Sequence, residues 1–195
     1  DKEYYGMVTF LLSASSIMMP LMAFGVHSTL IRFYSRYTDV AEREKFMTFM
    51  LFMPLLLIIP ITLITYFFYD QIAFLILEKN PETKPFLWLI PIIGICMGYF
   101  EVYYAWVKVH MKSVIGNFIS EVLVRVVIML MLFAVYWNWI SEDQFIYGLA
   151  VAYFLQVFVM KIYAMSLKMP VLSLQIPANV KEIFGYSFFI ILSGG

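Results

Sequence analysis

Long apolar stretches separated by short polar ones are the dominant pattern along this chain. A helix needs about 20 apolar residues to cross the roughly 30 Å hydrocarbon core of a bilayer, because lipid cannot satisfy a free backbone amide. Five stretches of the sequence are long enough. We expect them to form membrane-spanning helices at Tyr4–His27, Phe46–Tyr69, Phe86–Val107, Val114–Ile140 and Phe145–Met165.

The apolar runs inside these stretches do not alternate between apolar and polar residues. Phe49–Met53 and Leu55–Ile59 are apolar at every position, whereas the strands of membrane barrels alternate over about ten residues. Hydrophobic residues make up 63% of the chain and charged residues 13%, against about 45–50% and about 25% in soluble domains. A soluble domain of this size has too little interior to bury so much apolar surface. We therefore predict an all-α fold, a polytopic transmembrane helical bundle.

The two ends of the chain suggest a larger parent protein. A sixth apolar stretch begins near Ile183 and stops, with the chain, before it could cross a bilayer. The chain opens on Asp1 without a basic leader, so the first stretch is not a signal peptide. Residues 166–181 are more polar and contain two prolines, which predicts a cytoplasmic linker. We expect this linker to join an N-terminal lobe, residues 1–165, to the truncated first helix of a second lobe, residues 182–195.

Basic residues gather in alternate connections between the predicted helices. Nine of them fall on one side of the membrane: Arg32, Arg36, Arg43, Lys45, Lys108, Lys112, Lys161, Lys168 and Lys181. The other side holds Lys2, Lys79 and Lys84 among a larger number of acidic residues. Because cytoplasmic loops of membrane proteins are enriched in Lys and Arg, we expect the side with nine basic residues to be cytoplasmic. The first helix then enters the membrane from outside.

Composition and motifs exclude several classes of protein. The chain has 13 basic and 13 acidic residues and no net charge, which gives no reason to expect a nucleic-acid partner. Cys96 is the single cysteine, and the two histidines, His27 and His110, lie far apart in the sequence. We therefore expect no metal site and no cofactor. The motifs of serine hydrolases, zinc proteases and phosphate-binding loops are missing from the sequence, so we do not expect an enzyme.

Three charged residues, Glu101, Glu121 and Arg125, lie well inside the predicted spans. Glu121 and Arg125 are four residues apart on one helix, with the acid first, which is the better orientation for an ion pair. At about 1.5 Å per residue, Glu121 lies ~10 Å and Arg125 ~16 Å from the cytoplasmic end, and Glu101 lies ~9 Å from it on the preceding helix. Charges in the membrane tend to face a partner or a cavity. The group is either a neutralised cluster that holds helices together or a cavity wall where Arg125 receives an anion.

A second polar group lies at the cytoplasmic end of the first predicted helix. Arg32 and Arg36 share one helical face, and both are long enough to reach lipid headgroups from there. His27 lies one turn earlier and is either a hydrogen-bonded packing residue or a proton carrier. The alternative to the headgroup interpretation is that both arginines bind an anionic substrate.

Prolines fall inside three of the predicted spans, at Pro20, Pro54, Pro60 and Pro91. Each proline removes an intrahelical hydrogen bond, so we expect kinks or loosened turns there. Proline is common in membrane helices, and the kinks are either structural or serve a bundle that bends as it works.

Two short segments carry a resemblance to a known family. Glu3–Gly6, with its Glu-Tyr-Tyr-Gly sequence, precedes an apolar helix, and Gly25–Tyr34, with the sequence GVHSTLIRFY, ends it. This pattern resembles the second helix of Wzx-type polysaccharide-export flippases, which belong to the superfamily of the MATE antiporters and the lipid II flippase. The basic stretch before the next helix, the acidic outer loops and the proline-bearing linker before Ile183–Ser187 follow in the same register.

The resemblance implies a two-lobed transporter of the bacterial cytoplasmic membrane that works by alternating access. Its substrate would be an undecaprenyl-diphosphate-linked oligosaccharide, and its other partners would be membrane lipids and a coupling ion, proton or sodium. Family members commonly have cationic cavities, which matches Arg32, Arg125 and Arg36 to binding of the diphosphate. Glu101, Glu121 and His27 would form a coupling or structural polar cluster. The two acids beside Arg125 depart from the strongly cationic pattern of the family and leave both roles of that arginine open.

Two other functions remain as alternatives. A drug or cation antiporter of the same superfamily would use an acid in the membrane, such as Glu101, to couple transport to protons or sodium. A polytopic membrane glycan polymerase or ligase would need long outer loops that carry catalytic residues. The longest outer connection here is roughly Asp70–Pro85, so the enzyme is the weaker alternative.

The charge pattern makes a direct prediction about topology. In the full-length protein, with Cys96 replaced by serine, single cysteines at Asp39 and Ser173 should be protected from an impermeant thiol reagent in intact cells. A cysteine at Glu82 should react. Labelling of the Asp39 position from outside would reverse the orientation argued from the basic residues.

Overall fold

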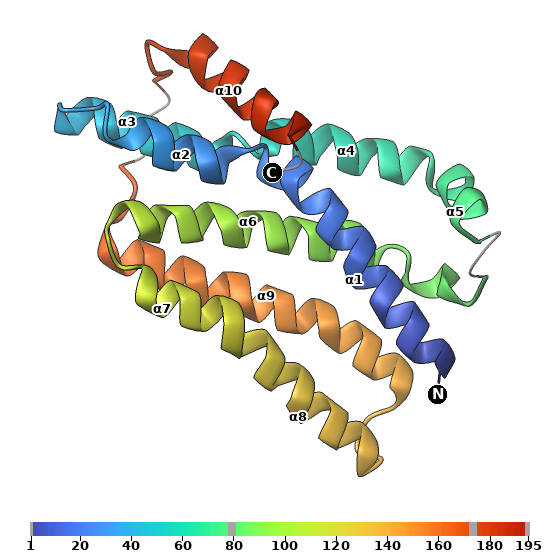
Figure 1. Ribbon diagram of the computed structural model, residues 1–195. Coiled ribbons are helices and arrows are strands. Elements are labelled where there is room, and N and C mark those ends of the chain that lie inside the picture. The colour runs from blue at the N-terminus through green and yellow to red at the C-terminus, as the bar shows by residue number, and fades with distance from the viewer. Residues whose placement is uncertain (1, 78–80, 172–174, 194–195) are drawn as a thin grey trace.

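The chain folds into a bundle of helices, and successive membrane segments run in opposite directions (Figure 1). The computed structural model describes residues 2–77, 81–171 and 175–193, and no strand occurs among them. Five helical segments are long and apolar enough to cross a membrane, so the predicted all-α, polytopic fold is confirmed. Asp1, Lys79 and Ser173, which the sequence analysis used, lie outside the described residues.

Several of the membrane segments consist of more than one helix. In chain order the elements are α1 (Lys2–Ala23), α2 (Val26–Tyr34), α3 (Val40–Phe52), α4 (Leu55–Phe67), α5 (Tyr69–Leu77), the 3₁₀ turn η1 (Pro81–Phe86), α6 (Leu89–Val109), α7 (Ser113–Phe118), the π-helical turn η2 (Ile119–Leu123), α8 (Val124–Tyr136), α9 (Glu142–Leu167) and α10 (Val180–Leu192). The five spans are Tyr4–Ala23, Val40–Phe67, Thr83–Val109, Ser113–Tyr136 and Glu142–Leu167.

The first span ends at Ala23, so its predicted continuation to His27 is wrong. Phe24 and Gly25 both adopt left-handed backbone angles, with φ of 50° and 60°, and no α-helix continues through two such residues. The chain resumes as α2, and the Gly25 carbonyl accepts from both the backbone and the side chain of Thr29. A side chain at Gly25 would also lie 2.5 Å from the Ser187 carbonyl of α10.

The second span begins earlier than predicted and is interrupted in its middle. Asp39 caps α3, since its carboxylate accepts from the Glu42 amide at 2.9 Å, and the helix therefore starts six residues before the predicted Phe46. Pro54 separates α3 from α4 because it cannot donate a backbone hydrogen bond. Nearby, the Leu51 carbonyl accepts from the Tyr99 hydroxyl of α6 at 3.4 Å.

α6 lies at the centre of the bundle, between α1 and α2 on one side and α9 on the other (Figure 1). Its closest neighbour is α1, which it meets at Gly94 and Gly98. A Cβ atom at Gly98 would lie 2.9 Å from the Ala23 backbone nitrogen. One turn away, the buried Ser15 hydroxyl donates to the Ile90 carbonyl at 3.1 Å. Two glycines four residues apart are a common feature of close membrane-helix contacts, because they allow the backbones to approach.

The two ends of the bundle differ in charge. The α2–α3 and α6–α7 connections and the segment after α9 meet at one end, where Lys168 pairs with Glu44 at 2.8 Å and Tyr163 reaches the Lys112 carbonyl. We call this the basic end. The N-terminus and the α8–α9 connection meet at the opposite, acidic end, where the Tyr4 hydroxyl lies 3.4 Å from Asp143.

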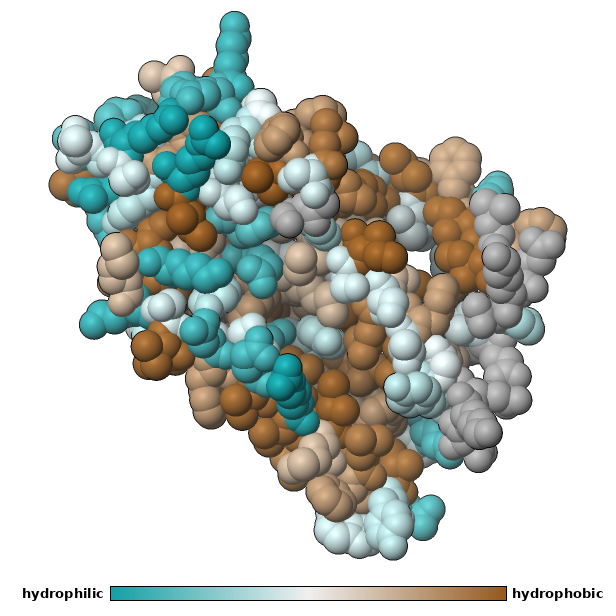
Figure 2. Space-filling model, viewed as in Figure 1, coloured by the Kyte–Doolittle hydropathy of each residue, from teal (hydrophilic) through white to brown (hydrophobic). Residues whose placement is uncertain are grey.

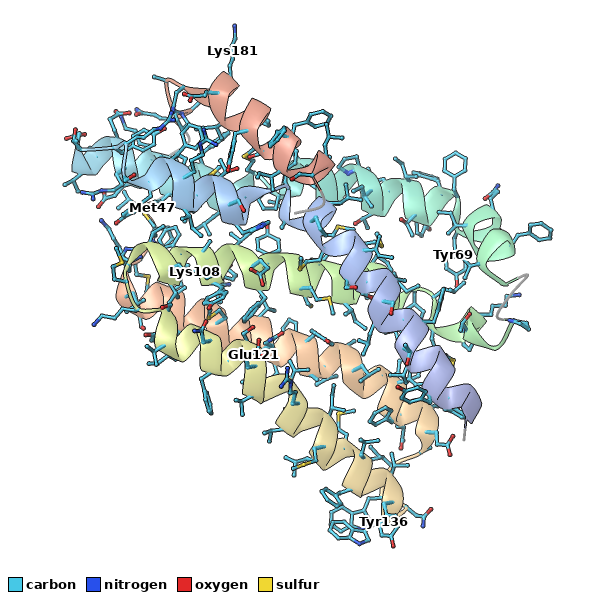
Figure 3. The ribbon with its side chains drawn as sticks, in the orientation of Figure 1. Met47, Tyr69, Lys108, Glu121, Tyr136 and Lys181 are labelled. Carbon is cyan, nitrogen blue, oxygen red and sulfur yellow. The ribbon has the colours of Figure 1, made fainter. Side chains whose placement is uncertain are left out.

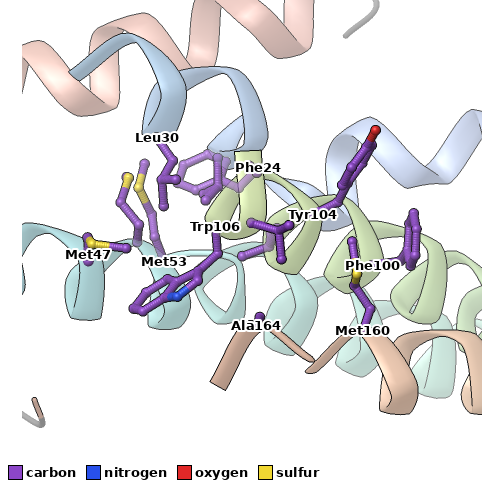
Figure 4. Packing of buried hydrophobic residues seen from close by; sticks show 14 of the residues in the cluster. Phe24, Leu30, Met47, Met53, Phe100, Tyr104, Trp106, Met160 and Ala164 are labelled. Atoms are coloured by element: carbon purple, nitrogen blue, oxygen red, sulfur yellow. The ribbon is translucent and has the colours of Figure 1, made fainter. Parts of the chain in front are cut away.

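Buried side chains form two clusters, one toward each end. The cluster at the basic end packs large side chains of α2, α3 and α6, including Leu30, Met47 and Trp106, against Ala164 of α9 (Figure 4). In α8, by contrast, Val124 is the one buried residue. Apart from Arg125, the exposed large side chains of α8 are apolar, as are many of those of α4, as expected where lipid covers a membrane protein.

The contact between α1 and α6 should be intolerant of added volume. Gly98→Ala places a methyl group against backbone and should lower the melting temperature of the full-length protein by at least about 3 °C, as overpacking costs about 1–3 kcal/mol. Gly185→Ala is the matched control, because nothing lies within 4 Å of a Cβ atom there. Equal melting temperatures for the two variants would contradict the close contact.

Candidate functional site

One face of the molecule carries polar residues at the level of the membrane. Figure 2 shows hydrophilic side chains gathered over the basic end and continuing toward the middle of an otherwise largely apolar face. In the same view Lys108 of α6 and Glu121 of η2 lie on this side (Figure 3). We call the membrane-level residues of this face the polar band; its members are His27, Glu101, Tyr104, Lys108, Glu121 and Arg125.

The centre of the polar band is a stripe along α6. Glu101, Tyr104 and Lys108 are spaced i, i+3 and i+7, so they share one helical face. The Lys108 ammonium lies over the Tyr104 ring, 3.8 Å from its centroid. The charge of Lys108 also acts on the Glu101 carboxylate and on the His27 imidazole of α2. Lys108 therefore lies within electrostatic range of His27 in α2.

Glu101 and His27 are both partly buried. Among the described residues, Glu101 forms no hydrogen bond and no ion pair, and the buried Nδ1 atom of His27 has no hydrogen-bond partner. Each is a polar group inside the bundle with unused hydrogen-bonding capacity.

Glu121 and Arg125 form the ion pair that their spacing predicts. Arg125 Nη2 donates to Glu121 Oε2 at 2.8 Å, and the two side chains are 78% and 64% exposed, respectively. The structure does not bring Glu101 to Arg125, although the charges of Glu101 and Glu121 both act on Tyr104. Because both members of the pair belong to one span, the pair itself does not hold two helices together.

The Glu121–Arg125 ion pair lies at the π-helical turn η2. Glu121 lies in η2, where the backbone is wound one residue wider than in an α-helix. Opposite the turn, Gln156 of α9 is buried, and its Nε2 atom donates to the Ile119 and Ser120 carbonyls at 3.4 and 3.5 Å. Our sequence analysis missed Gln156. The available signal was an uncharged amide in the middle of an apolar stretch, a residue type that links membrane helices through hydrogen bonds.

Arg32 and Arg36 both contact α10. Arg36 Nη1 is 2.6 Å from Glu182 Oε1, and the Arg32 guanidinium lies 4.2 Å from the centroid of the Tyr186 ring. Arg36 is therefore engaged in an ion pair. Arg32 is exposed. Its guanidinium N–H groups stay available as hydrogen-bond donors, because the cation–π contact with the Tyr186 ring is not a conventional hydrogen bond.

Further hydrogen bonds join α10 and the residue before it to α2 and to the segment that follows α2. The Thr29 and Ser187 hydroxyls are both fully buried and lie 2.7 Å apart. Beyond α2, the Tyr37 hydroxyl donates to Asn179 Oδ1. Burial raises the pKa of Tyr37, so the hydroxyl stays protonated and keeps this donor at neutral pH. The basic end of α2 is thus a junction between α10 and the rest of the bundle.

Loss of the Gln156 amide should weaken the contact between α9 and η2. Gln156→Leu should destabilise the full-length protein by about 0.6–1.7 kcal/mol, the range of interhelical hydrogen bonds in membranes. Thr65→Val is the control, because that hydroxyl bonds to its own helix at the Ile61 carbonyl. Reversible unfolding in detergent measures both variants, and a Gln156→Leu protein as stable as wild type would show that the amide contributes nothing there.

The arrangement contains charged and hydrogen-bonding groups and no recognisable metal centre. In the parts of the chain that the structure describes, no three His, Cys, Asp or Glu side chains gather to hold a metal ion. No known protein family, no curated protein and no solved structure matches this chain.

Proposed function

We propose that this chain is part of a flippase that moves an undecaprenyl-diphosphate-linked oligosaccharide across the bacterial cytoplasmic membrane by alternating access. One observation carries the proposal: an exposed arginine at the middle of a membrane span. Arg125 lies near the centre of the Ser113–Tyr136 segment, and its side chain is 78% exposed. A charged side chain so deep in the membrane faces a water-filled cavity or a partner and is costly against lipid.

The chemistry of Arg125 suits a diphosphate. Guanidinium carries five N–H donors in a planar fork that matches phosphate oxygens bidentately. Glu121 occupies one terminal nitrogen, Nη2, so the remaining donors are free to meet a phosphate. Glu121 also offsets the charge of Arg125 while no substrate is present, which lowers the cost of keeping an arginine at this depth.

Arg32 and Arg36 are proposed to act at the entrance. Both lie at the basic end, which the proposal takes as the cytoplasmic end from the positive-inside pattern. Arg32 is exposed beside Tyr186 and would meet the diphosphate first. Arg36 would reach the substrate only after leaving Glu182, which couples loading to the position of α10. His27 and Glu101, beside Lys108, would lie between the entrance and Arg125 along the polar band.

The proposal predicts different requirements at the two arginines. Charge should matter at both, but the fork geometry should matter more at the deeper site. Arg125→Lys should therefore lower surface glycan display about as much as Arg125→Ala does, whereas Arg32→Lys should retain most of it. The measurement is glycan display in a strain that depends on the full-length protein, with protein levels checked. Lys112→Ala, at an exposed loop position, is the control and should display glycan normally.

A structural role for the ion pair gives a different result. If Arg125→Met combined with Glu121→Gln restores both protein level and glycan display, the pair serves folding alone. Arg125 would then not bind the diphosphate, and the proposal would fail for this residue.

A cation antiporter is the second candidate, and Glu101 is the observation that favours it. Its partly buried carboxyl has no ion pair or hydrogen bond among the described residues, as expected of a group that binds a proton or sodium ion in turn. Ion-driven efflux of an organic cation that disappears in Glu101→Gln, with glycan display unchanged, would support the antiporter and contradict the flippase.

A further inference from the structure

We propose that a groove between α6 and α9 binds an anionic phospholipid of the leaflet at the basic end. The groove has a volume of about 560 Å³, within the range of about 300–1,000 Å³ typical of small-molecule sites. α6 contributes Ile92, Tyr99 and Tyr103 to its walls, and α9 contributes Phe154, Val157 and Lys161.

The groove lies on a different side of α6 from the polar band. At 3.6 residues per turn, Ile92, Tyr99 and Tyr103 point nearly opposite to Glu101 and Lys108 on the helix. The groove is therefore separate from the proposed transport site. A lipid bound there would be a permanent or regulatory partner, distinct from the transported substrate.

Polarity changes along the groove in the direction of the membrane normal. α6 and α9 both run from the acidic end toward the basic end. Ile92 lies in the first turn of α6 and Phe154 in the middle of α9, while Tyr103 and Lys161 lie in the last third of their helices. The groove is thus apolar toward the acidic end and carries hydroxyl and ammonium groups toward the basic end. A phospholipid has the same order, with its acyl chain in the core and its phosphate at the surface.

Lys161 has no partner of negative charge in the described part of the chain. It lies six residues before the end of α9, ~9 Å into the helix, and its side chain is exposed. Among the described residues it forms no ion pair, whereas Lys168, one to two turns later, pairs with Glu44. An unpaired ammonium at this depth extends toward the headgroups, where lipid phosphates lie.

The tyrosines add hydrogen-bonding capacity at the same level. The Tyr103 hydroxyl has no hydrogen-bond partner in the described part of the chain, whereas the Tyr99 hydroxyl donates to Leu51. The Tyr103 hydroxyl and the Lys161 ammonium thus provide two hydrogen-bond donor groups for one phosphate. A zwitterionic lipid brings its own ammonium, which Lys161 repels, so charge complementarity favours a lipid with net negative charge, as in other basic sites between membrane helices.

Native mass spectrometry of the full-length protein with phosphatidylglycerol and phosphatidylcholine tests the proposal. Wild type should bind one phosphatidylglycerol at least about fivefold more tightly than phosphatidylcholine, since one charge contact is worth about 1 kcal/mol. Lys161→Gln should abolish this preference, and Lys112→Gln, the same charge change at an exposed loop position, should preserve it. Val157→Trp, which fills the groove and keeps Lys161, should reduce binding of both lipids.

Two results would overturn the proposal. One is equal phosphatidylglycerol binding by wild type and Lys161→Gln. The other is a Val157→Trp protein that keeps its melting temperature and its bound lipid. If another helix of the parent protein fills the groove, Val157→Trp will unfold, and Lys161→Gln will bind phosphatidylglycerol as wild type does, which also overturns it. Glycan display of Lys161→Gln is a separate readout, so failure of the lipid site and failure of the flippase are distinguishable.

Discussion

The close approach of α1 and α6 is the contact on which the other features of the structure depend. Lipid provides little hydrophobic driving force between helices, so membrane helices associate through packing and hydrogen bonds. Gly94 and Gly98 remove the side chains that would keep α6 away from α1, and the Ser15 hydroxyl adds a hydrogen bond at the same crossing. With α6 held in the centre, one of its faces carries the polar band and a nearly opposite face forms the groove against α9.

Side-chain hydrogen bonds occur at three interruptions of the helices. The Thr29 hydroxyl adds a second hydrogen bond to the Gly25 carbonyl after the left-handed turn. The Tyr99 hydroxyl donates to the Leu51 carbonyl near Pro54, and the Gln156 amide donates to two carbonyls of η2. An unsatisfied backbone group in the membrane costs several kcal/mol. The break after the first span, the interruption of the second span and the π-helical turn of the fourth span thus each have a side-chain hydrogen bond to a nearby carbonyl. Two of these places lie next to candidate site residues, His27 and Glu121.

The sequence predicted the spans well because their signal is hydropathy, which depends only on length and composition. The break after Ala23 could not be read in the same way, because it requires a positive φ at Phe24, a residue that rarely adopts one. The close contact at Gly94 and Gly98 of α6 could have been predicted from the spacing of the two glycines, but it was not predicted. Within the site, the spacing of Glu121 and Arg125 predicted their pair correctly, since both lie on one helix. The placement of Arg36 against Glu182 depends on tertiary contacts between α2 and α10, which spacing does not encode.

The central claim is that Arg125 faces water within the membrane. It is tested most directly by the reactivity of Arg125→Cys toward a small, charged thiol reagent in the full-length protein with Cys96→Ser. Leu130→Cys, an exposed position of the same helix on a different side, is the reference for lipid. Met111→Cys, in the exposed α6–α7 connection, is the reference for water. The account predicts that the Arg125 position reacts at a rate near that of Met111 and far above that of Leu130. A rate as low as that of Leu130 would place Arg125 against lipid or protein and contradict the claim.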